Sequence, residues 1–321
     1  MGSISYGLDL EQDLATRTKT NPYITDFKLF RGHEGEMLPI MGGIHTSIDI
    51  SEAEDNLLNV GGKDWLHYFE KDEWPFDPTD PILYNYKQTG RDIALVVKDI
   101  LDTTLAQPNS LALTYTLAAV GQLVNYKIEP ADTEKILSKL DELSKIAPGF
   151  DFEITHDRIF KLYAPQKTRT LTGFALKQGH NIENLHYTEN GPQASKLRGF
   201  AQATTRLGYV VDDPAQTAYR RLVESVEFSD VTDANSLQEK TIAEASRMAA
   251  PAIEFSCSFV NYDNDLNFWG EVTLGDKIHV QGDLGYDMID DYFRFVGIEV
   301  APTDEGDEQI DLTFDNGTLA L

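Results

Sequence analysis

The sequence of 321 residues contains a single cysteine, Cys257. One cysteine cannot form an internal disulfide, and it cannot supply the several thiolates that a zinc ribbon or an iron–sulfur cluster needs. Cys257 lies in segment 253–260, in which apolar and polar residues alternate as on a strand with one buried face. We therefore expect a buried, unreactive thiol rather than a catalytic nucleophile.

Long apolar runs are also missing, since no stretch of eighteen consecutive apolar residues occurs. We therefore expect no membrane-spanning helix. The N-terminal residues 1–6 lack the basic region and apolar run of a signal peptide, and Tyr6 stands where N-myristoylation requires Ser or Thr. Apolar residues nevertheless make up 41% of the chain, which is enough for a sizeable core. We expect a soluble protein with one large domain or two to three small ones.

Basic residues are scarce. Lys and Arg total 27 against 53 Asp and Glu, which gives a formal net charge of −26. A chain with this charge repels phosphate backbones, so we do not expect it to bind nucleic acid tightly. Two interpretations of the charge remain open: ordinary solubility of an acidic protein, or an acidic surface that nucleic acid passes without adhering.

The common catalytic motifs are absent as well. The sequence contains no His-Glu-x-x-His, no Gly-x-Ser-x-Gly and no Gly-x-x-x-x-Gly-Lys-Ser/Thr. His180 and His186 are the closest pair of histidines, and on a strand they would share a face but stand about 20 Å apart, too far for one metal ion. Cys257 and His279 give no recognisable nucleophile–base signature.

One acidic segment, 263–267, begins like a calcium-binding loop, with oxygen ligands at alternate positions. The pattern then fails, because Phe268 stands where the sharp turn needs Gly and Leu274 stands where the bidentate Glu belongs. We interpret the segment as a turn between strands, in which Asp and Asn are favoured by their turn propensity.

A second acidic cluster consists of Asp287, Asp290 and Asp291. Paired carboxylates can hydrolyse glycosidic bonds, but only when their surroundings separate their pKa values. In so acidic a chain, a solvated loop is the favoured interpretation. We therefore assign no catalytic, cofactor-binding or metal-binding residue and expect no cofactor and no enzyme.

Aromatic residues are concentrated in segment 65–76, which includes Trp65, Tyr68, Phe69, Trp74 and Phe76. They could form a shelf that binds sugar rings. Aromatic residues of this kind more often anchor a core or a subunit interface, and we favour that interpretation.

The hydrophobic periodicity changes twice along the chain. Strand-like segments at 23–30, 44–50 and 57–60 precede an apolar stripe of helical spacing at 93–101. A second helix is predicted over 136–143, followed by a hairpin over 150–163. Residues 90–165 therefore resemble a compact α+β unit placed within a β-rich chain.

The C-terminal half is again predominantly β. Strand character at 181–203 is followed by a short helical piece over 213–223. Ser236 and Glu239 form a capping box that predicts a helix over 236–250, ended by Pro251. The remaining strands are predicted at 253–260, 277–281, 292–300 and 309–314.

Four stretches resemble the tail-tip hub proteins of long-tailed phages, which are minor tail proteins related to the central hub of contractile-tail baseplates. Residues 48–66 are similar to the opening strands of that family, and 136–163 to its inserted domain. Residues 217–251 are similar to a segment that ends in its helix, and 272–300 to its closing strands. The resemblance is one of pattern and order, without a single diagnostic motif.

This resemblance implies a mainly β fold with an α+β insertion and two tail-tube-like β-barrel domains. The implied domains are the N-terminal part of the first barrel at 1–88, the insertion at 89–166, the completion of the first barrel at 167–212, and the second barrel at 213–321 with helix 236–250.

The family also implies a location at the tip of a virion tail and a homotrimer whose ring continues the hexameric tail tube. The implied partners are the distal tail protein hexamer, the tape-measure protein and tail fibre or spike proteins. DNA would pass through the lumen without specific binding. The alternatives from the residues are a carbohydrate- or receptor-binding β-module, and a polysaccharide hydrolase with Asp or Glu as acid and base.

Overall fold

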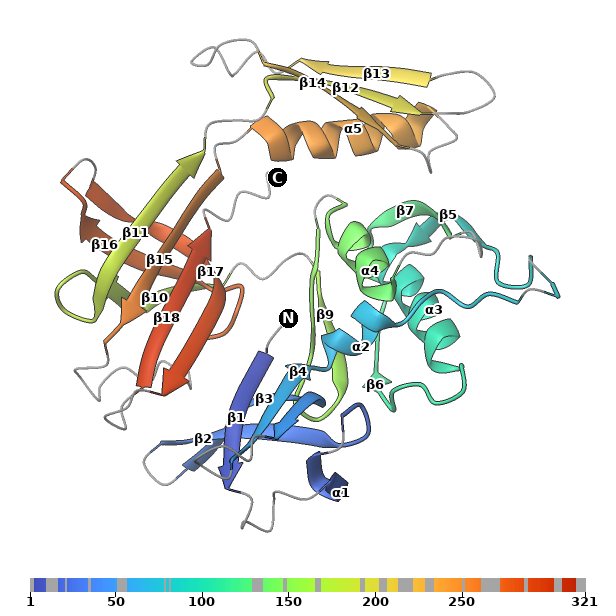
Figure 1. The fold of residues 1–321 in the computed structure, drawn as a ribbon. Helices are drawn as coiled ribbons and strands as arrows, with labels where there is room; N and C mark the ends of the chain where they lie inside the picture. Colours follow the sequence, from blue (N-terminus) through green and yellow to red (C-terminus); the bar gives the residue numbers. More distant parts are fainter. Residues whose placement is uncertain are drawn as a thin grey trace. The chain divides into compact units, whose positions relative to one another are not determined.

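The computed structural model of the protein gives most of the chain as strands joined by turns (Figure 1). The structure describes residues 3–9, 17–20, 22–33, 36–50, 57–77, 79–80, 82–128, 135–146, 149–164, 169–190, 194–201, 207–212, 222–228, 234–249, 252–260, 272–285, 288–302 and 308–315. The chain divides into two compact units. The first comprises Met1–Ser144 with Phe152–Tyr163, and the second comprises Lys145–Asp151 with Ala164–Leu321.

The first unit begins with a four-stranded antiparallel sheet in the order β1-β4-β3-β2. Its strands are β1 (Ser3–Asp9), β2 (Asp26–His33), β3 (Glu36–Ile50) and β4 (Leu57–Asp64), and helix α1 (Arg17–Thr20) lies between β1 and β2 in the sequence. A Cβ atom on Gly43 would stand 2.0 Å from the carbonyl oxygen of Lys63, so only glycine allows β3 and β4 to approach this closely. The strands predicted at 44–50 and 57–60 are confirmed, and β2 covers most of the strand predicted at 23–30.

The rest of the first unit combines helices and strands and begins at Leu66, before the α+β unit predicted over 90–165. Its helices are α2 (Leu66–Lys71), α3 (Ile93–Leu105) and α4 (Ile136–Ser144). Its strands are β5 (Tyr86–Asp92), β6 (Thr114–Tyr115), β7 (Leu123–Ile128), β8 (Asp151–Ile154) and β9 (Ile159–Tyr163), which form the sheets β5-β7 and β6-β9-β8. The apolar stripe of α3 is fully buried. Asp92 caps α3, because its carboxylate accepts a hydrogen bond from the backbone N–H of Ala94 at 3.0 Å.

The turn between β8 and β9 connects this α+β part to the four-stranded sheet. The guanidinium of Arg158 lies over the ring of Trp65, 4.6 Å from its centroid, and forms an ion pair with Asp26. Lys28 donates to Asp157 of the same turn at 2.5 Å. Cation–π and ionic contacts therefore attach the hairpin tip to strand β2 and to the start of α2.

The second unit contains a six-stranded sheet in the order β10-β16-β17-β18-β15-β11. Its strands are β10 (Thr170–Lys177), β11 (Ile182–Asn190), β15 (Ala252–Phe259), β16 (Lys277–Asp283), β17 (Met288–Pro302) and β18 (Glu308–Asp315). Strands β10 and β16 are parallel, whereas the other neighbours are antiparallel. One face of this sheet carries the core of the unit, which includes Phe255, Phe293, Phe295 and Phe314.

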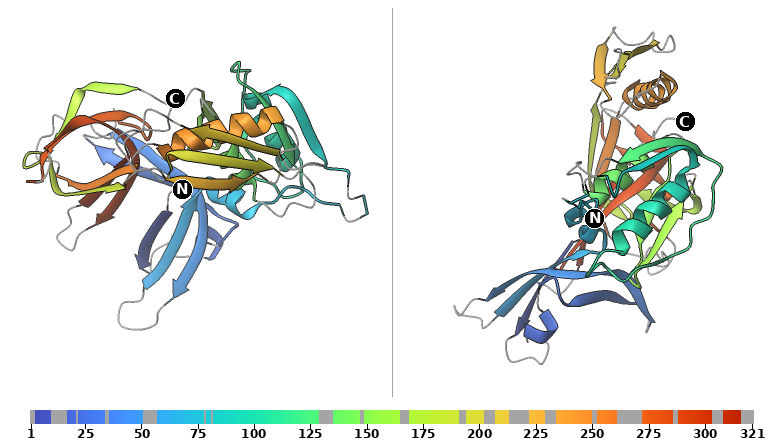
Figure 2. Two further views of the ribbon diagram at one scale, coloured as in Figure 1. Left: turned by 90° about the horizontal axis from the view of Figure 1, so that it is seen from above. Right: turned by 90° about the vertical axis from the view of Figure 1, so that its right-hand side faces the viewer.

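A smaller layer is inserted between β11 and β15. Strands β12 (Lys196–Ala201), β13 (Leu207–Asp212) and β14 (Val223–Glu227) form a sheet in the order β13-β12-β14. Helix α5 (Ala234–Ala249) lies on one face of this sheet, as the views in Figure 2 show. Leu237 and Ala201 are buried between the helix and the sheet.

The close contact between α5 and β12 depends on the absence of a side chain at Gly199. A Cβ atom there would stand 1.9 Å from the hydroxyl oxygen of Thr241, which itself donates to the carbonyl of Leu237. We expect Gly199→Ala to lower the free energy of unfolding by about 1–3 kcal/mol through overpacking. The double variant Gly199→Ala with Thr241→Ala should recover most of the lost free energy of unfolding, as measured by urea unfolding. Failure of the double variant to recover would show that the two residues do not compete for this space.

The predicted mainly β class is confirmed, whereas neither barrel closes among the described residues. The domain boundaries remain predictions, and β10 and β11 pair with the C-terminal strands although the resemblance assigned 167–212 to the first barrel. Two local predictions need correction. Helix α5 begins at Ala234, two residues before the predicted cap Ser236. The helical piece predicted over 213–223 is wrong at Val223, because strand β14 begins at that residue. The rest of that prediction, 213–221, lies outside the described residues.

Candidate functional site

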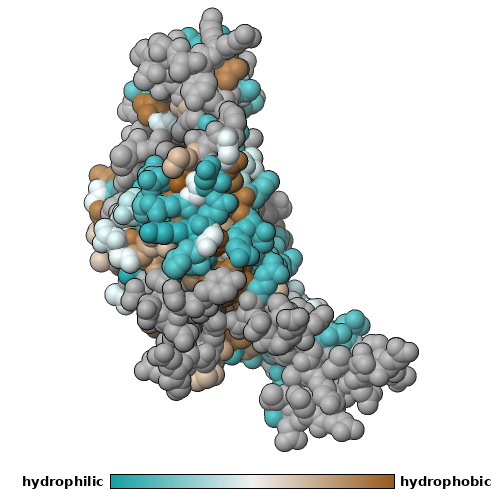
Figure 3. Space-filling view, turned by 90° about the vertical axis from the view of Figure 1, so that its left-hand side faces the viewer, coloured by the Kyte–Doolittle hydropathy of each residue, from teal (hydrophilic) through white to brown (hydrophobic). Residues whose placement is uncertain are grey.

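The six-stranded sheet of the second unit has a polar face opposite its core. Residues that alternate with the core residues share this side because successive side chains of a strand point to opposite faces. Figure 3 shows hydrophilic residues gathered over the part of the chain that holds this sheet. We define the outer face by the following residues: Lys177, Glu183, His186, Thr188, Glu254, Ser256, Ser258, Lys277, His279, Gln281, Asp290, Tyr292, Arg294, Glu299, Gln309, Asp311, Thr313 and Asp315.

The charges on the outer face are unevenly distributed. The cations Lys177, Lys277 and Arg294 lie on β10, β16 and β17. Strands β11, β15 and β18 contribute carboxylates and hydroxyls to this face but no Lys or Arg. Between two of these strands, the hydroxyl of Ser258 donates to the carboxylate of Asp311 at 2.7 Å. This half of the sheet therefore presents a continuous acidic and hydroxylated surface.

The aspartates that could act as a catalytic pair do not face each other. The predicted solvated loop is wrong for Asp290 and Asp291, which are adjacent on strand β17, so their side chains point to opposite faces of the sheet. Asp290 accepts hydrogen bonds from Gln281 at 2.9 Å and pairs with His279 at 2.8 Å. These contacts, with that from Gln281 the larger, hold the pKa of Asp290 below its usual value. Asp290 is thus an exposed, ionised carboxylate that contacts His279, and Asp290 lacks the raised pKa of a general acid. Asp287 lies outside the described residues.

The histidine pair does not form the strand pattern that its spacing suggested. His180 lies in the turn between β10 and β11, and His186 lies within β11. The expectation that both share one strand is therefore wrong, because the chain turns at 178–181 before β11 begins. Within the described part of the chain, no three His, Cys, Asp or Glu side chains gather closely enough to hold a metal ion. The calcium-like segment 263–267 falls outside that part.

Cys257 is buried in the core of the six-stranded sheet, as its alternating segment predicted. Burial, and to a smaller extent the negative charge of Asp311, raise the pKa of this thiol to about 12. A thiol with this pKa is almost entirely protonated at pH 7, and only the thiolate is a good nucleophile. The predicted unreactive role is consistent with this environment.

We expect Cys257 to react with a thiol reagent such as 5,5′-dithiobis(2-nitrobenzoate) at least about a hundredfold more slowly in the native protein than in urea, because reaction requires both access and ionisation. The rate of colour formation at pH 8 measures this difference. Rapid native-state labelling would contradict the burial of β15. Since this is the only cysteine in the chain, the same reaction monitors opening of the six-stranded sheet.

The aromatic segment does not form a sugar-binding shelf. Trp65, Phe69 and Trp74 are buried, and Tyr68 is partly buried. Phe76 alone among the five is exposed. The buried rings hold α2 and the following loop in the core of the first unit, as the favoured interpretation predicted, so they offer no flat surface for a sugar ring.

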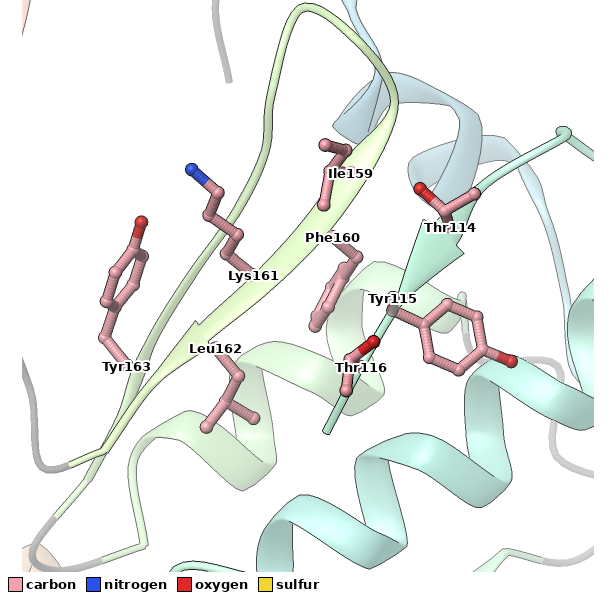
Figure 4. A pocket seen from close by; sticks show the side chains of 8 residues that line it. All are labelled: Thr114, Tyr115, Thr116, Ile159, Phe160, Lys161, Leu162 and Tyr163. Carbon is pink, nitrogen blue, oxygen red and sulfur yellow. The ribbon is translucent and has the colours of Figure 1, made fainter. Parts of the chain in front are cut away.

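A cavity of about 410 Å³ in the first unit is lined by residues of the paired strands β6 and β9 and by Thr116 (Figure 4). Lys161 and Tyr163 point to one side of β9, and Phe160 and Leu162 point to the other. The phenol of Tyr163 donates to Glu153 at 2.5 Å, and that of Tyr115 donates to Asp102 at 2.5 Å. Burial and, secondly, these hydrogen bonds raise the pKa of both phenols, so neither serves as a base at neutral pH. The lining residues therefore do not form a nucleophile–base pair.

One ion pair that sequence reasoning missed joins the start of β10 to the turn before β16. Arg169 donates to both carboxylate oxygens of Asp276, from Nε at 2.9 Å and from the terminal nitrogen at 2.5 Å. The backbone N–H and hydroxyl of Thr273 also donate to this carboxylate, at 2.8 and 3.0 Å. The two partners are 107 residues apart in the sequence, so no local pattern could have paired them.

None of the described helices has the length and apolar character needed to cross a membrane.

Comparisons with known proteins give a consistent result at the level of the fold. No protein-family model matches the sequence, and no curated protein does so. The 43 kDa tail protein of prophage MuSo2 from Shewanella oneidensis superimposes with a TM-score of 0.64 and 14% identity, over 97% of this chain and 88% of that one. A tail protein from Neisseria meningitidis MC58 gives 0.59 and 17%, over 92% and 88%. The resemblance found in the sequence is thereby confirmed for the fold: this chain has the fold of phage tail proteins.

Proposed function

We propose that this protein is a non-catalytic structural hub of a phage tail tip. Three copies would form a ring that continues the tail tube and connects it to the tip proteins. The single observation that carries the proposal is the similarity of fold to two tail proteins, each over more than nine-tenths of this chain. In this proposal each copy contributes two tube-like barrels, of which the first includes the sheet β1-β4-β3-β2.

The outer face of the six-stranded sheet supports a role for the sheet in lining the tube. Glu254 lies opposite Asp315 on β15 and β18, and Asp311 lies further along β18 opposite Ser258, without a Lys or Arg from either strand on that face. Arg294 of β17 lies beside Asp315 at the border of this acidic half. A lumen lined in this way would repel the phosphates of passing DNA and would not retain it. This proposal gives the charge of −26 a use beyond solubility.

The proposed partners are the distal tail protein hexamer, the tape-measure protein in the lumen, and tail fibre or spike proteins. The buried positions of Trp65 and Trp74, together with the opposed side chains of Asp290 and Asp291, give no support to a sugar-binding module or a hydrolase.

Electron microscopy of the chain mixed with the distal tail protein of the same tail tests this proposal. The expected result is a ring with threefold symmetry stacked on a sixfold ring, with a continuous central opening. Absence of any joint assembly at micromolar concentration, with both proteins folded, would contradict the proposed function.

A further inference from the structure

The loop between α2 and β5 in the first unit presents a group of exposed apolar side chains. Phe76 is 52% exposed, Ile82 is 75% exposed and Leu83 is 54% exposed. We call these three residues the apolar tip. Large apolar side chains that gather on one short loop are unusual on the surface of a folded protein and commonly mark an interaction site.

Several hydrogen bonds join the described residues of this loop. At its base, the buried Trp74 donates from Nε1 to the carbonyl of Tyr84 at 2.8 Å, so the two ends of the loop are tied together. The carboxylate of Asp77 accepts from the backbone N–H and the hydroxyl of Thr79, at 2.8 and 2.7 Å.

Successive turns continue beyond this point. The N–H of Leu83 donates to the carbonyl of Asp80 at 3.1 Å, and that of Asn85 donates to Ile82 at 3.0 Å. These bonds order the backbone of the described residues next to Ile82 and Leu83, which lowers the ordering that binding through the apolar tip requires.

The charge around the apolar tip indicates which partner it fits. Asp77 and Asp80 lie beside the apolar tip, and residues 74–86 contain no Lys or Arg. Glu73, at the base of the loop, is already paired with Lys135. A bilayer of anionic lipids is negative, so it repels Asp77 and Asp80 beside the apolar tip. Complementarity instead requires an apolar pocket with Lys or Arg at its rim.

We propose that the apolar tip inserts into an apolar, basic-rimmed pocket on a neighbouring tail protein. The proposal rests on the proposed function, from which it takes the class of partner. Ile82 and Leu83 supply the buried contact, since exposed apolar side chains that become enclosed at an interface contribute most to affinity. Asp77 and Asp80 face the basic rim.

The test measures binding of the full-length chain to the purified distal tail protein and, separately, to the tail fibre protein of the same tail, by isothermal titration calorimetry. The double variant Ile82→Ser with Leu83→Ser is compared with Met288→Ser as a matched control. Met288 is 74% exposed and lies on β17 in the second unit, so the control removes a side chain of similar exposure. Equal thermal unfolding of all three proteins is expected, because none of the replaced side chains is buried.

The proposal predicts that the double variant binds one of the two partners roughly a hundredfold more weakly, while Met288→Ser binds as the wild type does. It also predicts that affinity of the wild type for that partner falls as sodium chloride is raised, because the basic rim is screened. If the double variant binds each partner as tightly as the wild type does, this inference is overturned and the proposed function still stands.

Three further outcomes are decisive. A wild-type chain that binds neither tail protein would contradict the proposed function and this inference together. Self-association of the wild type that the double variant loses would assign the tip to a second copy. Retention on vesicles of phosphatidylglycerol that the double variant loses would assign it to a membrane. Either of the last two results overturns the proposal.

Discussion

Replacement of Phe255 by alanine is expected to lower the free energy of unfolding of the second unit by about 3–5 kcal/mol. Phe255 is 1% exposed, and its ring stacks on that of Phe314 with centroids 4.5 Å apart and planes 2° apart. The ring of Phe293 meets it edge-on at 4.8 Å. Truncation removes both aromatic contacts and leaves a cavity that a close-packed sheet cannot fill.

The size of this effect is large against the total stability of a domain, which is about 5–15 kcal/mol. Labelling of Cys257 at increasing urea concentration measures it, because the thiol lies in the same core. Phe255→Leu is the matched control and should cost less than about 2 kcal/mol, since it keeps most of the volume. A change of under 1 kcal/mol for the alanine variant would contradict the burial of Phe255 in this core.

Asp276→Asn is expected to destabilise the same unit by about 3 kcal/mol, because it removes the charge from four charge-assisted hydrogen bonds. The side chain of Asp276 is 1% exposed, whereas that of Arg169 is 54% exposed. Burial alone would raise the pKa of Asp276. The hydrogen bonds from Arg169 and Thr273 outweigh burial, so in the folded protein the pKa of Asp276 lies below its usual value.

The lowered pKa fixes the direction of the pH dependence. A carboxylate whose pKa is lower in the folded protein stabilises it above the pKa of the unfolded chain, about 3.9, and this stabilisation is lost as the pH falls through the folded pKa. The difference in urea midpoint between wild type and Asp276→Asn should therefore be full at pH 7 and shrink below about pH 4. A difference that grew on acidification would contradict the ionised pair with Arg169.

Local sequence patterns predicted individual elements well in this chain. The apolar stripe at 93–101 became α3, because helical spacing alone determines which residues face the core. The alternation around Cys257 became β15 for the same local reason. Helix α2 was not predicted, since Leu66–Lys71 is only six residues long and has no side-chain cap.

The pairing of distant strands could not be predicted in the same way. Strand β10 pairs in parallel with β16, about a hundred residues later, and nothing in either segment specifies the partner. The implied assignment of 167–212 to the first barrel reflected the order of elements in the resembled family. The structure instead places β10 and β11 in one sheet with the C-terminal strands.

The sequence-based predictions about candidate sites depended mainly on the catalytic and metal-binding motifs that the sequence lacks. The burial of Cys257 was predicted from the alternation around it. The contact of Asp290 with His279 depends on the pairing of β16 with β17, which the sequence did not specify. The apolar tip could not be found from sequence, because Ile82 and Leu83 look like any short apolar pair until their exposure is known. The outer face of the six-stranded sheet likewise required the strand registers that align β11, β15 and β18.

The most direct test of the hub is the mass of the chain in solution, measured by light scattering alone and after mixing with the distal tail protein. The proposal predicts either a trimer of the 36.0 kDa chain, or a complex of three copies with six copies of the distal tail protein. Weak self-association of the chain alone is compatible with the proposal, provided that the partner closes the ring. A strict monomer under all these conditions would contradict the account.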